Sequence, residues 1–335
     1  MFAGNAVFRL WAAALVLSAF VADGAHAHPP GDSVTAAATR FVAQLPAEKR
    51  KAVQRPFEDE DRFAVNWLPG RRAGVPLDGL DAKQTATLRA LLHHVLSHAG
   101  QDRVDAVIAT EAALGVLTNS PDYRNPKKYY TAVFGAPSPG KRWGLRFEGH
   151  HLSVNLTFDG DKIVSASPLF VGANPETVPE GPDKGLRALG RQVDLARAAV
   201  NALAPEQRKK AAGSEEWFSG FLSSPGGRRA TLGKPAGLVA VDAPPEAQKQ
   251  LRALVADYVR TITENYADRY LEWFEREEWP TVRFFWKGGT DPGATYYWRL
   301  QGKRFLMEHD GQEGGGHIHS IWRDAEADFG GPGKN

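Results

Sequence analysis

Two stretches of alternating residues, far apart in the chain, restrict the fold more than any other feature. We interpret residues 143–158 as one long strand and residues 162–170 as the strand that returns after a turn at Asp159-Gly160. Residues 282–324 contain shorter strand-like segments separated by glycine-rich turns. Alternation of this kind indicates strands with one buried face, and short turns join antiparallel neighbours. We therefore expect an antiparallel β-sheet built from two hairpin or meander systems.

Helical spacing of apolar residues fills much of the remaining chain. The clearest case begins at Pro245, a residue suited to the first turn of a helix. We also predict helices over residues 35–53, 82–99, 102–117, 186–203 and 266–273, and a short strand over residues 57–67. The expected fold class is α+β, an antiparallel sheet covered by several α-helices. Residues 28–335 should form one large domain, with a loop-rich excursion over residues 213–243.

Composition excludes several classes of protein. The chain has 335 residues and a formal net charge of only +2, which gives no electrostatic footprint for nucleic acid or an anionic membrane. It contains no cysteine, so disulfides and thiolate nucleophiles are excluded and any metal site must use His, Asp, Glu or Tyr. Loops that bind dinucleotides or phosphates are also absent, so no organic cofactor is indicated.

The first residues are typical of an export signal. Arg9 precedes an apolar run over residues 10–21, and Ala25 and Ala27 provide a small-residue cleavage pattern. We predict a signal peptide over residues 1–27 and a periplasmic or secreted protein. An uncleaved anchor is the alternative. No later apolar run approaches the roughly 20 residues that a membrane helix needs, so we expect no stable membrane span after signal removal.

A triple glycine followed by a His-x-His pair marks a candidate site. Residues 314–316 are all glycine, and they lead into His317-Ile318-His319. Side chains two positions apart on a strand share a face, so His317 and His319 should point the same way. Such a pair can bind a metal or transfer protons. It can equally consist of two hydrogen-bonded structural histidines.

A second candidate group lies in the first strand system. Counting back along one continuous strand from its apolar half, Arg146, Glu148 and His150 fall on the core-facing side. Buried charges need partners, since an unpaired one costs several kcal/mol. A bulge at Gly149 would turn His151 inward instead of His150. The choice between these two histidines therefore stays open.

Several motifs in a fixed order resemble a known bacterial family. They are residues 142–153, 172–175, 296–302, 304–308, 317–324 and 328–330, with Asn125 and Phe134-Gly135. Together they resemble the family catalogued as domain of unknown function 3500, over roughly residues 82–330. The resemblance implies no activity. This chain departs from the family pattern at Leu145, where an aromatic residue is common, and at His309, where a tyrosine is expected.

Three hypotheses follow, and the first is a mononuclear metal site. Its ligands would be His317, His319, one of His150 and His151, and a carboxylate, Glu148 or Glu308. This set suits zinc, copper or iron, used either for hydrolysis with Glu148 as base or for redox chemistry on a small molecule. Metal bonds are about 2 Å long, so side chains more than about 10 Å apart would exclude the site.

The other two hypotheses need no metal. In the second, His317 or His319 acts as base and Glu148 as acid, while arginines clamp an anionic substrate. In the third, the protein is not an enzyme but binds a sugar or carboxylate on an aromatic surface, and its histidines are structural. The candidate catalytic residues are thus Glu148 and Arg146, and the candidate ligand-binding residues are Tyr297, Arg299 and Arg323.

Overall fold

A computed structural model describes residues 32–213, 221 and 232–331 of the chain. The predicted signal peptide lies outside these residues, as does most of the predicted excursion. The chain divides into Met1–Asp32 and Ser33–Asn335, and only the second unit is considered below. Its helices are α1 (Val34–Ala43), α2 (Ala47–Val53), α3 (Ala82–His93), α4 (His98–Leu117), α5 (Gly190–Asn201), α6 (Pro205–Ala212), α7 (Pro245–Val259) and α8 (Glu264–Trp273).

The strands form one sheet in the order β1-β3-β4-β5-β7-β12-β11-β10-β9-β8, with β2 beside β3 and β6 beside β5. Their bounds are β1 Gln54–Arg55, β2 Val75–Pro76, β3 Tyr130–Phe134, β4 Arg142–Gly149, β5 Leu152–Asp159, β6 Lys162–Ser165, β7 Leu169–Ala173, β8 Leu238–Val239, β9 Arg283–Gly288, β10 Tyr296–Gln301, β11 Phe305–Gln312 and β12 His317–Asp324. Only the short β1–β3 pair is parallel. The predicted α+β class with two antiparallel strand systems is confirmed.

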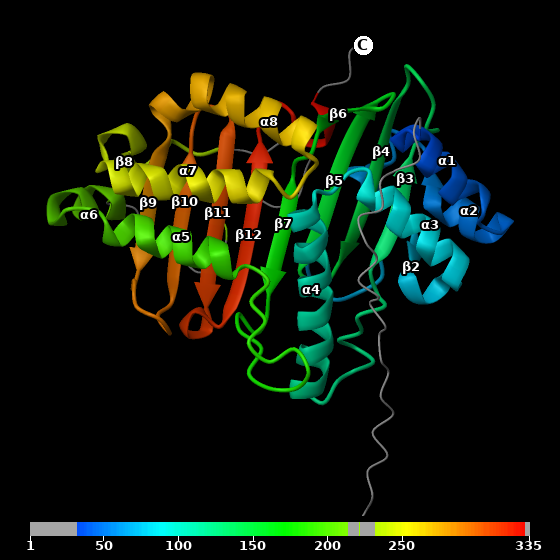
Figure 1. Cartoon of the computed structure of the whole chain (residues 1–335), viewed down its shortest axis with the longest axis horizontal. Coiled ribbons are helices and arrows are strands. Elements are labelled where there is room, and N and C mark those ends of the chain that lie inside the picture. The colour runs from blue at the N-terminus through cyan, green and yellow to red at the C-terminus, as the bar shows by residue number, and fades with distance from the viewer. Residues whose placement is uncertain (1–31, 214–220, 222–231, 332–335) are drawn as a thin grey trace, which may run out of the picture. The chain divides into compact units, whose positions relative to one another are not determined.

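The pairing of β7 with β12 joins the two strand systems. These antiparallel neighbours place Phe170 opposite Ile321 and Gly172 opposite His319. Figure 1 shows the green strands of the first system beside the orange and red strands of the second. Segments far apart in the sequence therefore meet at the centre of the sheet, where the candidate site lies.

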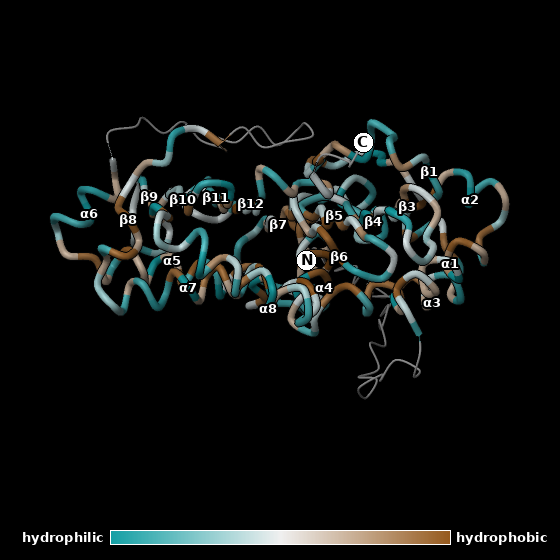
Figure 2. Tube along the Cα trace, turned by 90° about the horizontal axis from the view of Figure 1, so that it is seen from above, coloured by the Kyte–Doolittle hydropathy of each residue, from teal (hydrophilic) through white to brown (hydrophobic). Residues whose placement is uncertain are grey.

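Helices cover one face of this sheet. Figures 1 and 2 show α4, α5, α7 and α8 on the same side of the strands. Alternate residues of β4 and β5 face them, including the fully buried Trp143 and Phe158, whose rings stack with centroids 4.0 Å apart. A smaller apolar cluster on the other face contains Phe63, Val65, Phe170, Ile321 and Phe329. The histidines of β12 point to this second face, because His319 shares a side of its strand with Ile321.

The prediction of one long strand over residues 143–158 is wrong. It is a hairpin in which β4 and β5 pair with Gly149 opposite Leu152, so His150 and His151 form a two-residue turn. Side chains of residues directly opposite each other point to the same face of the sheet. Because the turn has two residues, odd-numbered residues of β4 point to the same face as even-numbered residues of β5. Arg146 and Glu148 consequently lie on the face opposite to Leu152, and not on the helix-covered side.

Four smaller expectations also need correction. The predicted strand over residues 57–67 contains a 3₁₀ helix at Glu60–Phe63, and its alternating apolar residues pack against the sheet without joining it. The helix predicted over residues 82–99 ends at His93, and a new helix starts after Ser97, whose hydroxyl accepts from Gly100 N at 3.0 Å. The helix predicted over residues 35–53 is interrupted before α2. The strand predicted over residues 162–170 is divided into β6 and β7.

Within the described ranges, none of the helices is both long and apolar enough to cross a bilayer.

Candidate metal centre

The turn between β4 and β5 presents two consecutive histidines. His151 has φ +61°, a left-handed conformation that few residues other than glycine adopt, although His is enriched among those that do. The backbone is fixed by bonds from His151 N to Trp67 O (3.1 Å) and from Gly172 N to His151 O (2.7 Å). Tyr129 also donates its hydroxyl to His150 O at 3.0 Å. The turn is therefore held on both sides, which fixes the direction of the two imidazoles.

Strand β12 supplies the other two histidines. It lies between β7 and β11, and its register places His317 opposite Gln312 and His319 opposite Asp310. Period-two geometry directs both imidazoles to one face, as predicted. Gly172 lies next to them on β7, and a Cβ atom there would be 3.0 Å from His151 Cδ2 and 2.9 Å from Ile318 O. Only glycine leaves room at this point for the His151 ring.

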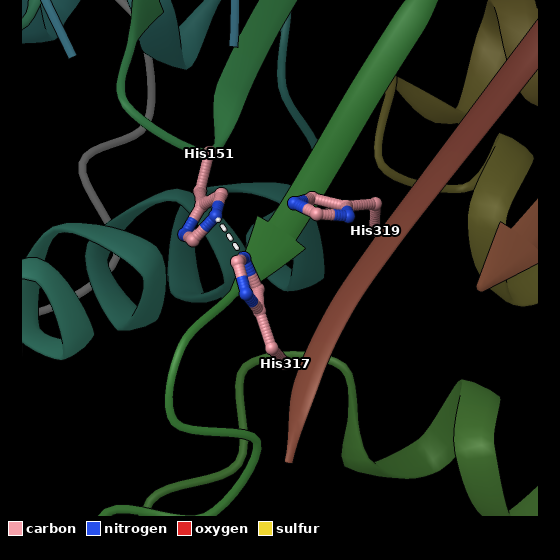
Figure 3. A group of neighbouring side chains, drawn as sticks. All are labelled: His151, His317 and His319. Carbon is pink, nitrogen blue, oxygen red and sulfur yellow. Dashed lines mark hydrogen bonds between the residues drawn. The ribbon is translucent and has the colours of Figure 1, made fainter. Parts of the chain in front are cut away.

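Three imidazoles converge on a common volume. His151 Nε2 lies 3.1 Å from His317 Nε2, and one ring nitrogen from each of His151, His317 and His319 lies within 4.8 Å of the others. Figure 3 shows the rings directed toward one another from the β4–β5 turn and from β12. His151 is 3% exposed, while the side chains of His317 and His319 are 20% and 13% exposed. The group is thus partly open to solvent along its β12 side.

Carboxylates orient the two strand histidines from outside. Asp310 Oδ1 lies 3.0 Å from His319 Nδ1, and Gln312 Nε2 donates to Asp310 Oδ2 at 2.7 Å. Glu313 Oε1 is 3.7 Å from His317 Nδ1. The Asp310 contact is a hydrogen bond that occupies Nδ1 of His319, whereas Glu313, with a side chain 71% exposed, lies on the Nδ1 side of His317 beyond hydrogen-bond distance. A carboxylate on the far nitrogen is the usual support of a metal-binding histidine, because it fixes the tautomer and the ring orientation.

His150 belongs to a different arrangement. Its ring stacks on His151 with centroids 3.7 Å apart and an angle of 26°, its Nδ1 is hydrogen-bonded to Glu111 Oε2, and Arg124 Nη1 lies 3.0 Å from its Nε2. Glu111, His150 and His151 also have ligand atoms within 4.8 Å. However, the rings of His150 and His151 are stacked, so the lone pairs of their nitrogens run roughly parallel and do not converge on one metal position. We therefore interpret Glu111, His150 and Arg124 as a hydrogen-bonded chain that supports the turn.

Burial favours the neutral forms of His150, His151 and His317. Burial lowers the pKa of His151 well below its usual value, and the neighbouring His150 and His319 lower it further. Burial also lowers the pKa of His317, with a further contribution from His319. Burial lowers the pKa of His150 despite the opposing hydrogen bond from Glu111. Neutral imidazole is the form that binds metal ions, so little proton release would accompany binding at pH 7.

The other predicted site residues lie in the interior of the sheet's second face. Arg146 Nε is 3.0 Å from Glu148 Oε1, with both side chains at most 3% exposed, and burial raises the pKa of Glu148. Tyr297 donates its hydroxyl to Glu308 Oε1, and Arg299 is buried beside Phe285. Arg323 pairs with Asp328 at 2.7 Å, and both are fully buried. Neither Glu148 nor Glu308 is in the two candidate ligand groups found among the described residues.

Comparison with known proteins identifies the family but no activity. The model of a family described as "Protein of unknown function (DUF3500)" matches residues 28–331. The chain belongs to this family. The search of curated proteins found no match, and neither did the search of solved structures. The resemblance inferred from the sequence is confirmed. The DUF3500 motifs over residues 142–153 and 317–324 form the β4–β5 hairpin and β12, so the resemblance includes the histidine cluster.

Sequence reasoning missed the supporting residues of this DUF3500 protein. Glu111 interrupts the apolar stripe of α4 between Val107 and Leu114, and a charged residue in a buried stripe was the available signal. Asp310 becomes visible once the register of β11 and β12 is known, because it lies directly opposite His319. Arg124 lies in a loop, and no sequence pattern connects it to His150.

Proposed function

We propose that this protein is an exported, metal-dependent hydrolase in which His151, His317 and His319 bind one divalent transition-metal ion. The observation that carries the proposal is the convergence of three imidazoles from two distant segments, with the Nε2 atoms of His151 and His317 3.1 Å apart. The export assignment rests on the N-terminal sequence alone. The Arg146–Glu148 pair and Glu308 are not included, because their interior partners already account for them.

The distances are compatible with one metal ion bound by all three rings. Two nitrogen ligands at about 2.05 Å from one ion in tetrahedral geometry are separated by about 3.3 Å. The His151–His317 separation of 3.1 Å is close to this value. A ring nitrogen of His319 lies within 4.8 Å of the other two, so an inward movement of at most about 1.5 Å gives it the same tetrahedral spacing. Such a movement would lengthen the contact between His319 Nδ1 and Asp310 Oδ1, which is 3.0 Å in the structure.

The ligand set favours hydrolysis. Three protein ligands leave one position of a tetrahedral ion open for water or substrate, and zinc in such a site acidifies the water that it binds. The chain contributes the positions of the three rings, of which His319 is held by Asp310 and His151 by the β4–β5 turn. Copper and iron are compatible with imidazole ligands as well. With either of these ions, the same residues would serve an oxidoreductase.

A non-catalytic sugar- or carboxylate-binding protein receives less support. That alternative depended on Tyr297, Arg299 and Arg323 as a ligand surface. Their side chains are at most 4% exposed, and Tyr297 and Arg323 have interior carboxylate partners. A ligand could reach them only after these buried pairs were broken, which is costly.

Elemental analysis of the purified protein tests the proposal. We expect about one zinc ion per chain in the unmodified protein and none in the double variant His317→Ala/His319→Ala. His98→Ala is the matched control, because His98 is exposed on α4 and outside the cluster. Metal retained by the double variant would overturn the site. Stoichiometric copper or iron would keep the site but replace the hydrolase by an oxidoreductase.

A further inference from the structure

A hollow of about 350 Å³ lies between α8, β6 and the end of β12. Its apolar wall contains Tyr266, Tyr270 and Trp273, which recur at helical spacing on α8 and therefore face the same direction. The hydroxyls of the two tyrosines accept from Ala166 N and from Trp322 Nε1, each at 3.2 Å. Their polar atoms are thus used inside the protein, and the rings present apolar surface to the hollow.

The charges around the hollow are unbalanced. Arg304 forms a two-bond pair with Asp324, at 2.8 and 2.7 Å, and a further pair with Glu326 at 3.1 Å. Lys162 and Arg269 also line the hollow, and both are exposed. No carboxylate in the described part of the chain pairs with either of them. Two cations therefore remain at the rim of an aromatic hollow.

We propose that this hollow binds a small aromatic carboxylate. The ring would lie against Tyr266, Tyr270 and Trp273, since aromatic pairs gain free energy beyond simple burial. The carboxylate would lie between Lys162 and Arg269, where charge-assisted hydrogen bonds are available. A volume of about 350 Å³ is near the lower limit for ligand sites, which restricts the ligand to about one ring.

This site is separate from the histidine cluster. Asp324 lies five positions after His319 on β12, a distance of about 17 Å along a strand. Odd and even positions also point to opposite faces of the sheet. The binding of an aromatic carboxylate can therefore be tested independently of metal binding.

Isothermal titration of benzoate into chelator-treated, full-length protein tests the inference. We expect benzoate to bind and benzamide, which has the same ring without the charge, to bind at least tenfold more weakly. Arg269→Gln and Lys162→Gln should each weaken benzoate binding by about tenfold, the loss expected for one charge-assisted contact. Arg276→Gln is the matched control, because Arg276 is exposed just beyond α8, does not line the hollow and should leave the affinity unchanged.

Three results would overturn the inference. The first is equal affinity for benzoate and benzamide, or no heat from either at 20-fold excess over 1 mM protein. The second is unchanged benzoate affinity in both Arg269→Gln and Lys162→Gln. The third is loss of benzoate binding in His317→Ala/His319→Ala with retention in the two rim variants, which would place the anion at the histidine cluster. Both rim side chains are exposed, so their replacement should not unfold the protein.

Discussion

The Nε2 atoms of His151 and His317 lie 3.1 Å apart, although 166 positions separate the two residues in the sequence. Two neutral imidazoles can approach in this way only if one nitrogen carries a proton and donates it to the other, or if a cation lies between them. A ring nitrogen of His319 lies within 4.8 Å of both. Holding the nitrogens of three rings close together removes these rings from water, which costs free energy of hydration.

Metal ions should stabilise the folded protein through this cluster. At a free ion concentration 100 times the dissociation constant, binding to the native state alone contributes about 2.7 kcal/mol. For a chain of this size we expect the midpoint of thermal unfolding to rise by roughly 4 °C on addition of zinc. His151→Ala should remove this rise and His98→Ala should preserve it. Thermal unfolding with and without chelator measures the effect, and an equal rise in both variants would contradict the three-histidine site.

Gly172→Ala tests how closely the backbone of β7 controls His151. The new methyl group would be 3.0 Å from His151 Cδ2 and 2.9 Å from Ile318 O, so either the ring or the strand must move. We expect a destabilisation of about 1–3 kcal/mol from overpacking and at least tenfold weaker zinc binding. Gly233→Ala is the matched control, because nothing lies within 4 Å of its added Cβ. Chelator competition gives the affinity, and urea unfolding gives the stability.

Glu111→Ala tests the chain that supports the turn. Without Glu111, His150 Nδ1 loses its hydrogen-bond partner and the charge of Arg124 loses a nearby carboxylate. A buried polar group left unpaired costs about 1–3 kcal/mol, which urea unfolding should detect. Asp102→Ala, at an exposed position of the same helix, should change little. If the two variants are equally stable, Glu111 does not support the turn.

The sequence predicted the sheet better than it predicted the site. Period-two alternation is local, so the strands over residues 282–324 and their antiparallel order could be inferred from residues near one another. The pairing of β7 with β12 has no local signal, and the approach of His151 to His317 depends on it. The metal-site hypothesis brought the two strand systems together because it took ligands from both. No sequence pattern specified how the strands pair.

The errors at the site have one physical origin. Both positions of the turn between β4 and β5 are histidines, and not the glycine or asparagine that usually marks a two-residue turn. The sequence therefore predicted one strand where the structure has a hairpin. That interpretation placed Glu148 beside the histidines. The structure instead places it against Arg146 at 3.0 Å. The reversal of the chain at His150 and His151 thus determines which carboxylates lie near the cluster.

His309 should make stability depend on pH. Burial lowers the pKa of His309 to about 3 from the ordinary value of 6.5, and the ring is stacked between Tyr296 and Trp298. Because the folded state holds this histidine neutral, the unfolded state binds a proton first as the pH falls below 6.5. The contribution of neutral His309 to the free energy of unfolding is therefore complete above pH 6.5 and is lost progressively toward pH 3. Between pH 7.5 and 5.0 it should lower the free energy of unfolding by about 2 kcal/mol.

His309→Gln separates this effect from the other titrating groups. Glutamine does not titrate, and its amide can both donate and accept, so it can replace the hydrogen bond of 2.9 Å between the Tyr296 hydroxyl and His309 Nε2. Urea unfolding at pH 7.5 and 5.0 should show a smaller loss of stability for this variant, by about 2 kcal/mol, even if it is less stable at both pH values. His98→Gln, at an exposed position, should lose as much stability as the unmodified protein. An identical pH dependence in His309→Gln and the unmodified protein would show that His309 is protonated as readily in the folded as in the unfolded state.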